Sequence, residues 1–176
     1  KEIGKNILMK IDEMVKANPH ITNDRVLVID GEGWHQGVIG IVAAKVKEFF
    51  GKPTVIISRD GEEAKGSGRS VEGFSLCDAV FACSDLLTHF GGHPMAAGLS
   101  LKSKNIELFR QRINEYALKQ ENMPFNACNI DCRLNPALIS VQLVEPLAYL
   151  APYGAGNPTP LVGLYKMTLS QITPLS

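Results

Sequence analysis

Two runs of β-forming residues flank one apolar helical segment, and this arrangement constrains the fold more than any other feature. Residues 25–30 (RVLVID) and 54–59 (TVIISR) are rich in Val and Ile, and a glycine-containing turn follows each run. Between them, apolar residues occupy nearly all faces of residues 38–50, which predicts a well-buried helix that stops at Gly51. A strand, a helix and a strand in so short a span favour a parallel βαβ unit with a right-handed crossover.

Apolar periodicity and turn residues extend this unit in both directions. They predict helices over residues 1–17, 76–90 and 106–120, and extended segments over 63–70 and 95–101. The Asp60-Gly61 turn indicates that the segment 63–70 pairs with the strand before it. The expected fold class is therefore α/β, a mixed sheet with its βαβ unit flanked by helices.

The alternation of strands and helices ends near Met123-Pro124. Strands are favoured over residues 129–134 and 161–169, a helix over 136–150, and a structured loop over APYGAGNPTP, residues 151–160. No closing element precedes Ser176, so we expect the opening of a second, β-rich domain that is cut short. Residues 1–16 resemble the middle of a helix without an initiator Met, which suggests a piece of a longer protein.

The composition excludes several classes of protein. With 45% hydrophobic and 20% charged residues, the chain can fill a core and is not intrinsically disordered. It contains no apolar run of about 18 residues, so we expect no membrane span, and the cysteine usage discussed below favours a cytoplasmic protein. The 18 Lys and Arg residues balance the 18 Asp and Glu residues. The net charge of zero therefore does not indicate nucleic-acid binding, although a local basic patch is compatible with it.

The cysteines favour free thiols over disulfides or a zinc site. No C-x-x-C pair occurs, and Cys83 lies within an apolar helical pattern, as expected of a buried thiol in a cytosolic protein. The spacing of Cys83, His89 and His93 could serve zinc, but no fourth ligand is evident and two glycines interrupt the segment. The four cysteines are Cys77, Cys83, Cys128 and Cys132.

The stretch KGSGRS (65–70) combines two cations, two serine hydroxyls and two glycines. Arginine can bind a phosphate through two parallel hydrogen bonds, hydroxyls can donate to its oxygens, and glycine lets the backbone approach. If the segment is a strand, Ser67 and Arg69 share one face, and the two glycines and Ser70 share the other. A phosphate site and a plain solvated hairpin strand both fit this pattern.

Two other glycine-rich stretches surround a histidine. In GGHPMAAG (91–98), His93 has only small neighbours, which leaves room either for a ligand or for tight packing of a strand against a helix. In GEGWHQGVIG (31–40), the turn from strand to helix exposes unpaired N–H groups at a positive helix end, which favours an anion. Trp34 could add a stacking face there and His35 a proton donor, but such turns are also common for packing alone.

The sequence contains no recognisable set of catalytic residues. The aspartates are scattered singly, and no cluster of carboxylates or histidines could hold a pair of divalent metal ions for phosphoester hydrolysis. No G-x-S-x-G, Walker A or C-x-x-C motif occurs either. The residues alone therefore predict a phosphate-binding surface without catalytic machinery.

Four motifs in this order resemble the RecJ family of single-strand-specific 5′→3′ exonucleases, within the DHH phosphoesterase superfamily. They are VLVIDGEGWHQGVIGIVAAKV, EAKGSGRS with GFSLCDAV, LLTHFGGHPMAAGLSL and PYGAGNPTP, and the resemblance covers about residues 25–160. GGHxxAAG together with GSGRS is typical of the DHH-associated domain, which also occurs in oligoribonucleases, cyclic-dinucleotide phosphodiesterases and alanyl-tRNA synthetases. The GWHQGVIG turn and the GAGNP loop point to RecJ among these.

The resemblance implies a protein of two lobes and a barrel. The DHH lobe carries the Asp and His residues that bind Mn²⁺ or Mg²⁺ and activate water, so no catalytic or metal-binding residue is expected in this chain. Residues 1–20 then correspond to the end of the interdomain linker helix, and residues 21–122 to the DHH-associated substrate-binding domain. Residues 123–176 correspond to the start of a truncated oligonucleotide-binding (OB-like) domain.

The resemblance also implies site residues and partners. Phosphate contacts fall on Ser67, Arg69, Ser70, Gly91, Gly92 and His93, with Trp34, His35 and Lys65 as further substrate contacts. Residues 96–98 are then assigned to packing beneath a neighbouring helix. The implied function is to bind single-stranded DNA for an exonuclease of DNA recombination and repair. The implied partners are single-stranded DNA, a single-strand-binding protein and a recombination helicase. The resemblance implies no contact with a membrane.

Two alternative functions stay open. A small-oligonucleotide or cyclic-dinucleotide phosphodiesterase of the same superfamily would share the associated lobe, but the barrel-like tail argues against it. A non-catalytic nucleic-acid-binding relative would carry a degraded metal site upstream of Lys1, whereas an intact DHH motif there would indicate an enzyme. Because the metal-binding lobe is missing, this chain alone is expected to be inactive as a nuclease.

Overall fold

A computed structural model describes residues 2–120, 130–154 and 156–168. The chain divides into two compact units, Lys1–Asn126 and Ala127–Ser176, and each has its own sheet. Among the described residues, no helix combines the length and the apolar character that crossing a membrane requires.

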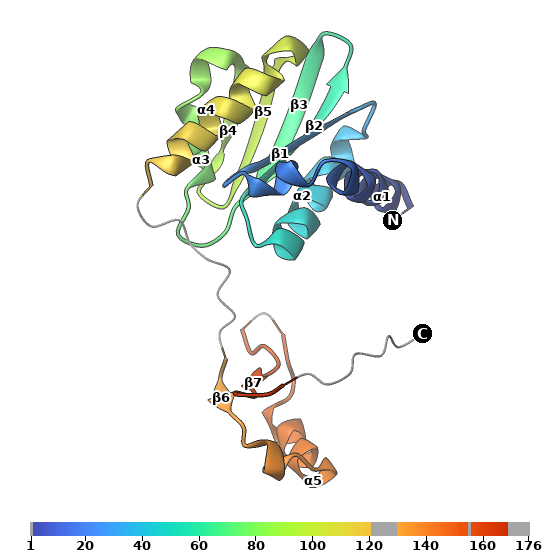
Figure 1. The fold of residues 1–176 in the computed structure, drawn as a ribbon, viewed down its shortest axis with the longest axis vertical. Helices are drawn as coiled ribbons and strands as arrows, with labels where there is room; N and C mark the ends of the chain where they lie inside the picture. The colour runs from blue at the N-terminus through green and yellow to red at the C-terminus, as the bar shows by residue number, and fades with distance from the viewer. Residues whose placement is uncertain (1, 121–129, 155, 169–176) are drawn as a thin grey trace. The chain divides into compact units, whose positions relative to one another are not determined.

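The larger unit is built on a five-stranded mixed sheet (Figure 1). In spatial order its strands are β1 (Leu27–Glu32), β2 (Thr54–Asp60), β3 (Glu63–Arg69), β5 (Ala96–Lys102) and β4 (Leu87–His93). β1 and β2 are parallel and are joined by helix α2 (Gln36–Phe50), so the predicted βαβ unit is confirmed. The remaining neighbours are antiparallel, which also confirms the predicted pairing of β3 with β2.

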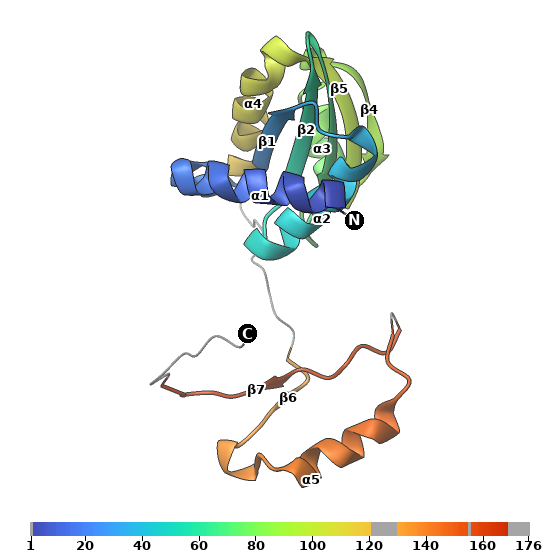
Figure 2. The same ribbon diagram turned by 90° about the vertical axis from the view of Figure 1, so that its right-hand side faces the viewer.

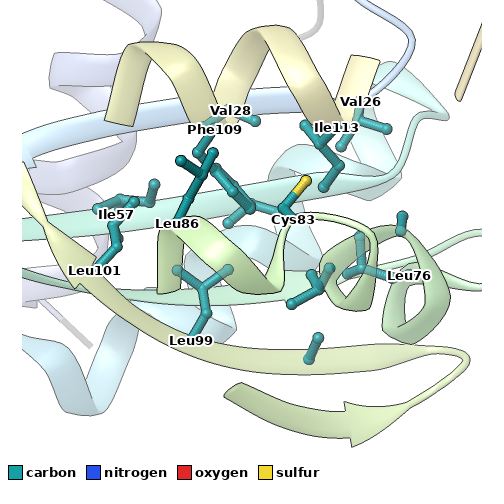
Figure 3. Close-up of a cluster of buried hydrophobic side chains, with 14 of the residues drawn as sticks. Val26, Val28, Ile57, Leu76, Cys83, Leu86, Leu99, Leu101, Phe109 and Ile113 are labelled. Atoms are coloured by element: carbon teal, nitrogen blue, oxygen red, sulfur yellow. The ribbon is translucent and has the colours of Figure 1, made fainter. Parts of the chain in front are cut away.

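Helices cover both faces of this sheet. α1 (Glu2–Ala17) and α2 pack on one face through an apolar cluster that includes Ile11. α3 (Leu76–Phe81) and α4 (Ile106–Leu118) pack on the other face, where Phe109 is fully buried (Figure 3). The expected α/β class, with helices flanking a mixed sheet, is therefore confirmed.

The end of α2 follows from the residues after it. Gly51 adopts the left-handed conformation with φ 64°, and its N–H donates to Lys47 O at 2.8 Å. Glycine reaches this conformation without steric cost, and Pro53 cannot continue a helix. The chain therefore leaves α2 where the sequence predicted and enters β2 at once.

The two edges of the sheet differ. α4 lies along β1 (Figure 2), and the Asn114 side-chain amide accepts from Val26 N at 2.9 Å and donates to Val26 O at 3.0 Å, as a neighbouring strand would. Arg110 Nε donates to Val28 O at 3.1 Å on the same edge. At the opposite edge, β4 pairs only with β5 among the described strands. Side chains of α4 thus pair with the backbone of Val26 and Val28 at the β1 edge, whereas no described strand or helix side chain is shown to pair with the outer edge of β4.

The helix predicted over residues 76–90 is wrong in its second half. α3 ends at Phe81, a short 3-10 turn covers Ser84–Leu86, and the chain then enters β4. Cys83 does face the core, as the helical spacing predicted. From Leu87 onward the residues pair with β5, because the hydrogen bonds between strands outweigh a weak local helical pattern.

The three cysteines that the structure describes are free thiols, as predicted. Cys83 is fully buried between the sheet and its helices, and this burial raises the pKa of its thiol to about 11. His89 and His93 are exposed on β4, so the spacing that could have served zinc does not form a site. Within the described residues, no group of three or more His, Cys, Asp or Glu could hold a metal ion. Cys128 lies outside the described residues.

The smaller unit contains a two-stranded parallel sheet. Its strands β6 (Cys132–Arg133) and β7 (Val162–Gly163) fall within the two predicted strands but are only two residues long. Asn157 Nδ2 donates to Leu150 O at 2.7 Å and to Pro152 O at 3.1 Å, which holds the loop predicted over 151–160. Residues 129, 155 and 169 of the predicted segments lie outside the described residues.

The single helix predicted over residues 136–150 is broken into short turns. These are the 3-10 turn Pro136–Leu138, α5 (Val141–Val144) and the 3-10 turn Glu145–Leu150. Pro146 has no N–H to donate and its ring clashes with the preceding turn, so α5 cannot continue through it. The apolar periodicity correctly indicated helical turns in this segment, but Pro146 prevents one continuous helix.

Candidate nucleic-acid interface

One face of the larger sheet is only partly covered. α2 contacts β2 and β3, whereas β5 and β4 are open on that side. A groove of about 440 Å³ lies here, bounded by Gln36 and Ile39 of α2. Its polar strand residues are Lys65, Ser67, His89 and Ser100. No Asp or Glu of the described part of the chain lines this groove, so it favours an anionic ligand.

The strand register arranges the open face in three rows. Residues directly opposite each other in antiparallel strands point to the same side of a sheet. Because β3 pairs with β5 and β5 with β4, each row takes one residue from each strand. They are the Lys65 row (Lys65, Ser100, His89), the Ser67 row (Ser67, Gly98, Gly91) and the Arg69 row (Arg69, Ala96, His93).

Ser67 and Arg69 share one face of β3, as strand alternation predicted. Gly40 of α2 leaves room for both, since an added Cβ there would lie 3.0 Å from Ser67 Oγ and 3.0 Å from Arg69 Nη2. Gly66 and Gly68 face the opposite, apolar core, where an added Cβ would lie 2.9 Å and 2.5 Å from buried leucine side chains. The glycines of GSGRS therefore serve packing, and its Ser67 and Arg69 side chains serve the open face.

The Arg69 guanidinium is anchored on one nitrogen. Nη1 donates to Gly68 O at 2.8 Å and to Ser67 Oγ at 3.3 Å. Within the described part of the chain, Nε and Nη2 donate to no acceptor. A guanidinium that is held in position and keeps free donors suits a phosphate, which accepts two parallel hydrogen bonds.

Ser70 does not reach this face. It is 1% exposed, and its Oγ donates to Phe74 O at 2.6 Å. The hydroxyl therefore holds the chain after β3, on the side of the sheet away from Ser67 and Arg69. This geometry corrects the expected phosphate contact of Ser70, and the reason is the strand alternation that places the other two residues correctly.

His93 ends β4 and is exposed in the Arg69 row. Its Nδ1 accepts from Met95 N at 3.4 Å, a long hydrogen bond across the β4–β5 turn. The imidazole therefore lies across β5 from Arg69, on the same side of the sheet. The structure thus places His93, from the motif GGHPMAAG, on the same side of the sheet as Ser67 and Arg69, which belong to the separate motif GSGRS.

The small residues of GGHPMAAG serve different purposes. Gly92 has φ 152°, and an added Cβ would lie 2.2 Å from Ala96 O, so the backbone itself requires glycine. Gly91 and Gly98 are exposed, and an added Cβ would meet nothing within 4 Å at either position. Ala97 is buried in the core, as expected, but Gly98 lines the open groove, so its assignment to packing beneath a helix is wrong.

The turn between β1 and α2 does not offer the expected stacking face. Trp34 is only 6% exposed and packs over Gly31, where an added Cβ would lie 2.2 Å from the indole ring. The expected contact of Trp34 with substrate is therefore wrong, because the indole belongs to the core under α1 and α2. His35 is exposed and caps α2, its Nδ1 accepting from Gly37 N at 3.1 Å, so one N–H expected to bind an anion is already satisfied.

Two groove residues, His89 and Ser100, were not predicted from the sequence as substrate contacts. The helix expected over residues 76–90 placed His89 in a different kind of element. The available signal was the stretch HFGGH, because in a strand its two histidines and the first glycine share one face. Ser100 follows the motif GGHPMAAG by two residues and carries no signal of its own.

We expect His93→Ala to change the melting temperature of the chain by less than about 4 °C, because the side chain is exposed and makes one long hydrogen bond. Leu99→Ala on the neighbouring strand is the reference for lost packing, and it should cost about 2–5 kcal/mol of unfolding free energy. Thermal unfolding followed by circular dichroism measures both. A drop with His93→Ala that approaches the Leu99→Ala drop would assign the histidine to packing.

The chain matches two family models. The DHHA1 domain model covers residues 23–119, and the RecJ OB domain model covers residues 130–176. The first match contains β1 to α4 and therefore all three rows of the open face. Both matches agree with the resemblance drawn from the motifs.

Curated relatives point the same way. The chain is 34% identical to the single-stranded-DNA-specific exonuclease RecJ of Bacillus subtilis over 98% of its own length and 22% of that protein. It is 36% identical to the protein of the same name from Escherichia coli over 78% of its own length and 25% of that protein. The chain thus spans about a quarter of the length of these relatives.

Solved structures agree with the sequence relatives. Crystal structures of RecJ from Thermus thermophilus match with TM-scores of 0.73 for the complex with Mn²⁺ and 0.70 for the complex with Mg²⁺. The identities are 30% and 28%, over 93% and 90% of this chain and 24% of the crystallised chain in each case. The fold, the open face with its GSGRS and GGH residues and the domain match have one common explanation: the chain belongs to the DHHA1 domain family.

Proposed function

We propose that this chain binds the phosphates of single-stranded DNA as part of a RecJ-like 5′→3′ exonuclease that acts in DNA recombination and repair. The observation that carries the proposal is the convergence of Ser67, Arg69 and His93 on one open sheet face. The relatives with the same domain are named as single-stranded-DNA-specific exonucleases, which supports this choice of ligand.

The three residues offer a phosphate complementary groups. Arg69 supplies charge and free donors, Ser67 a hydroxyl, and His93 an imidazole that can donate a hydrogen bond. Gly91, two positions before His93 on β4, leaves open space on the same face, so a sugar–phosphate backbone can approach the strand closely. No base-specific contact is required, in keeping with binding that depends on the strand backbone rather than on its sequence.

Hydrolysis requires groups that this face does not contain. The matching crystal structures hold Mg²⁺ or Mn²⁺, but within the described residues no cluster of His, Cys, Asp or Glu fits such an ion. We assign the metal ions and the activation of water to a DHH lobe outside this chain. The part played by the described residues is to bind and position the strand.

The proposal includes a division of the chain and a cellular setting. Residues 1–20 form the end of an interdomain linker, residues 21–122 the substrate-binding domain, and residues 123–176 the start of an OB-like domain. The RecJ OB match supports the last of these. The partners would be single-stranded DNA, a single-strand-binding protein and a recombination helicase, in the cytoplasm.

A binding and digestion assay with the purified chain tests this function. We expect it to bind fluorescent oligo-dT more tightly than duplex DNA, with an affinity that falls as salt rises, by a slope of roughly 0.7 per phosphate contacted. In the presence of Mn²⁺ the labelled strand should stay intact. Metal-dependent digestion by this chain would contradict the assignment of hydrolysis to another lobe, and salt-independent binding would contradict phosphate recognition.

A further inference from the structure

The Lys65 row lies on the same open face as Ser67 and Arg69. The motif resemblance named Lys65 as a further substrate contact, but the proposed function assigns no role to Lys65, Ser100 or His89. We propose that Lys65, Ser100 and His89 form a second phosphate subsite, so that the face holds two phosphates of one DNA strand running along β3. This inference rests on the proposed function, because it extends the same strand beyond the Arg69 contact.

The backbone of β4 turns His89 toward the groove. Leu87 pairs with Leu101, and His89 pairs with Ser100, so β4 contains one extra residue, Thr88, at this point. Leu87 packs against the apolar core, and strict alternation would direct His89 to that same face. The register shift instead places His89 opposite Ser100, where it lines the groove. Such shifts are known for re-aiming a side chain beside a functional site.

The charge of Lys65 is available for a ligand. Lys65 is exposed, and it forms no ion pair within the described part of the chain. The nearest acidic residue on the same face of β3, Glu63, is two positions away and is paired with Lys102. Ser58, opposite Lys65 on β2, is uncharged and buried. The subsite therefore offers one free cation, one imidazole and one hydroxyl.

The spacing of the rows fits two phosphates rather than one. Same-face residues of a strand lie roughly 7 Å apart, so the Lys65 row lies about 7 Å from the Ser67 row and about 13 Å from the Arg69 row. Ser67 and Arg69 can share one phosphate, because Arg69 Nη1 lies 3.3 Å from Ser67 Oγ. One phosphate group cannot also span the roughly 13 Å from the Arg69 row to the Lys65 row, whereas successive phosphates of an extended strand can. Between the subsites lie Gly98 and Gly91, where no packing or backbone reason requires glycine and an added Cβ would meet only open space. This space leaves room for the strand to cross from one subsite to the other.

Two ligands of different length test the second subsite. We expect His89→Ala and Lys65→Ala each to weaken binding of the chain to a ten-residue oligo-dT by roughly five- to tenfold, and to leave binding of 5′-dTMP unchanged. Lys65→Ala should also lower the salt slope by roughly 0.7, which loss of packing would not do. Arg69→Ala should weaken both ligands. His20→Ala removes an exposed histidine on the 3-10 helix Pro19–Asn23 and serves as the matched control.

The outcomes separate the two proposals. If Arg69→Ala weakens both ligands while His89→Ala and Lys65→Ala leave oligo-dT binding unchanged, the second subsite is wrong and the proposed function stands. If His89→Ala weakens 5′-dTMP as much as oligo-dT, the rows form a single phosphate site and the second subsite is again wrong. If Arg69→Ala changes neither ligand, the proposed function fails and the inference fails with it. The melting temperature of each variant should be measured to check that the variant is folded.

Discussion

Gly92→Ala is expected to lower the unfolding free energy of the chain by at least about 3 kcal/mol. Gly92 has φ 152°, which residues with a side chain rarely adopt. An added Cβ would also lie 2.2 Å from Ala96 O and 2.7 Å from Ala97 Cα. These are backbone atoms of the paired strand, so they cannot move without breaking the β4–β5 register at its open end. The unfavourable backbone conformation and the steric overlap of the added Cβ therefore both destabilise the Gly92→Ala variant.

Gly91→Ala is the control for this prediction. It changes the adjacent glycine in the same strand, but its added Cβ would meet nothing within 4 Å. Its melting temperature should equal or slightly exceed that of the unmodified chain, because alanine loses less backbone entropy on folding than glycine. Thermal unfolding of both variants measures the difference. Similar losses from the two substitutions would show that the strain assigned to Gly92 is absent.

Arg69→Ala is expected to weaken binding of single-stranded DNA by roughly 1–3 kcal/mol, which corresponds to about 5- to 150-fold. The guanidinium is held by Gly68 O and Ser67 Oγ and still has free donors for a phosphate. Arg69→Lys keeps the charge but loses the planar fork, so we expect an intermediate affinity with a salt slope close to that of the unmodified chain. Fluorescence anisotropy at several salt concentrations measures both quantities.

Arg112→Ala is the matched control for the loss of an arginine. Arg112 lies on α4 in a surface ion pair with Asp85, away from the residues of the groove. Surface pairs contribute little to stability, so this variant should fold and bind DNA as the unmodified chain does. Equal affinities of the Arg69→Ala and Arg112→Ala variants would remove Arg69 from the phosphate site.

Local patterns in the sequence were sufficient for the βαβ unit and for the orientation of Ser67 and Arg69. Alternation of side chains along an extended backbone depends on no other part of the chain, so it placed these two residues on one face. The same rule placed Ser70 on the other face, although the motif resemblance assigned all three to phosphate. Where local geometry and motif membership disagreed, the structure agreed with local geometry.

Predictions failed where a residue's role depends on what lies across from it. Residues 84–90 carried a helical pattern, but the free edge of β5 pairs with them and makes a strand from Leu87 onward. Trp34 looked available for stacking because a turn in a sequence does not show that α1 and α2 will cover it. These outcomes rest on contacts between segments far apart in the chain, which short-range periodicity does not contain.

Periodicity and residue type within short segments were enough to predict the α/β class, the parallel βαβ unit and the shared face of Ser67 and Arg69, because each of these depends on neighbouring residues alone. Contacts between strands were needed to show that Gly92 must be glycine while Gly91 and Gly98 leave open space, and that His89 lies in one row with Lys65. These properties depend on how the strands pair. Register across β3, β5 and β4 sets which side chains meet, and a single extra residue in β4 reverses the face of every residue after it.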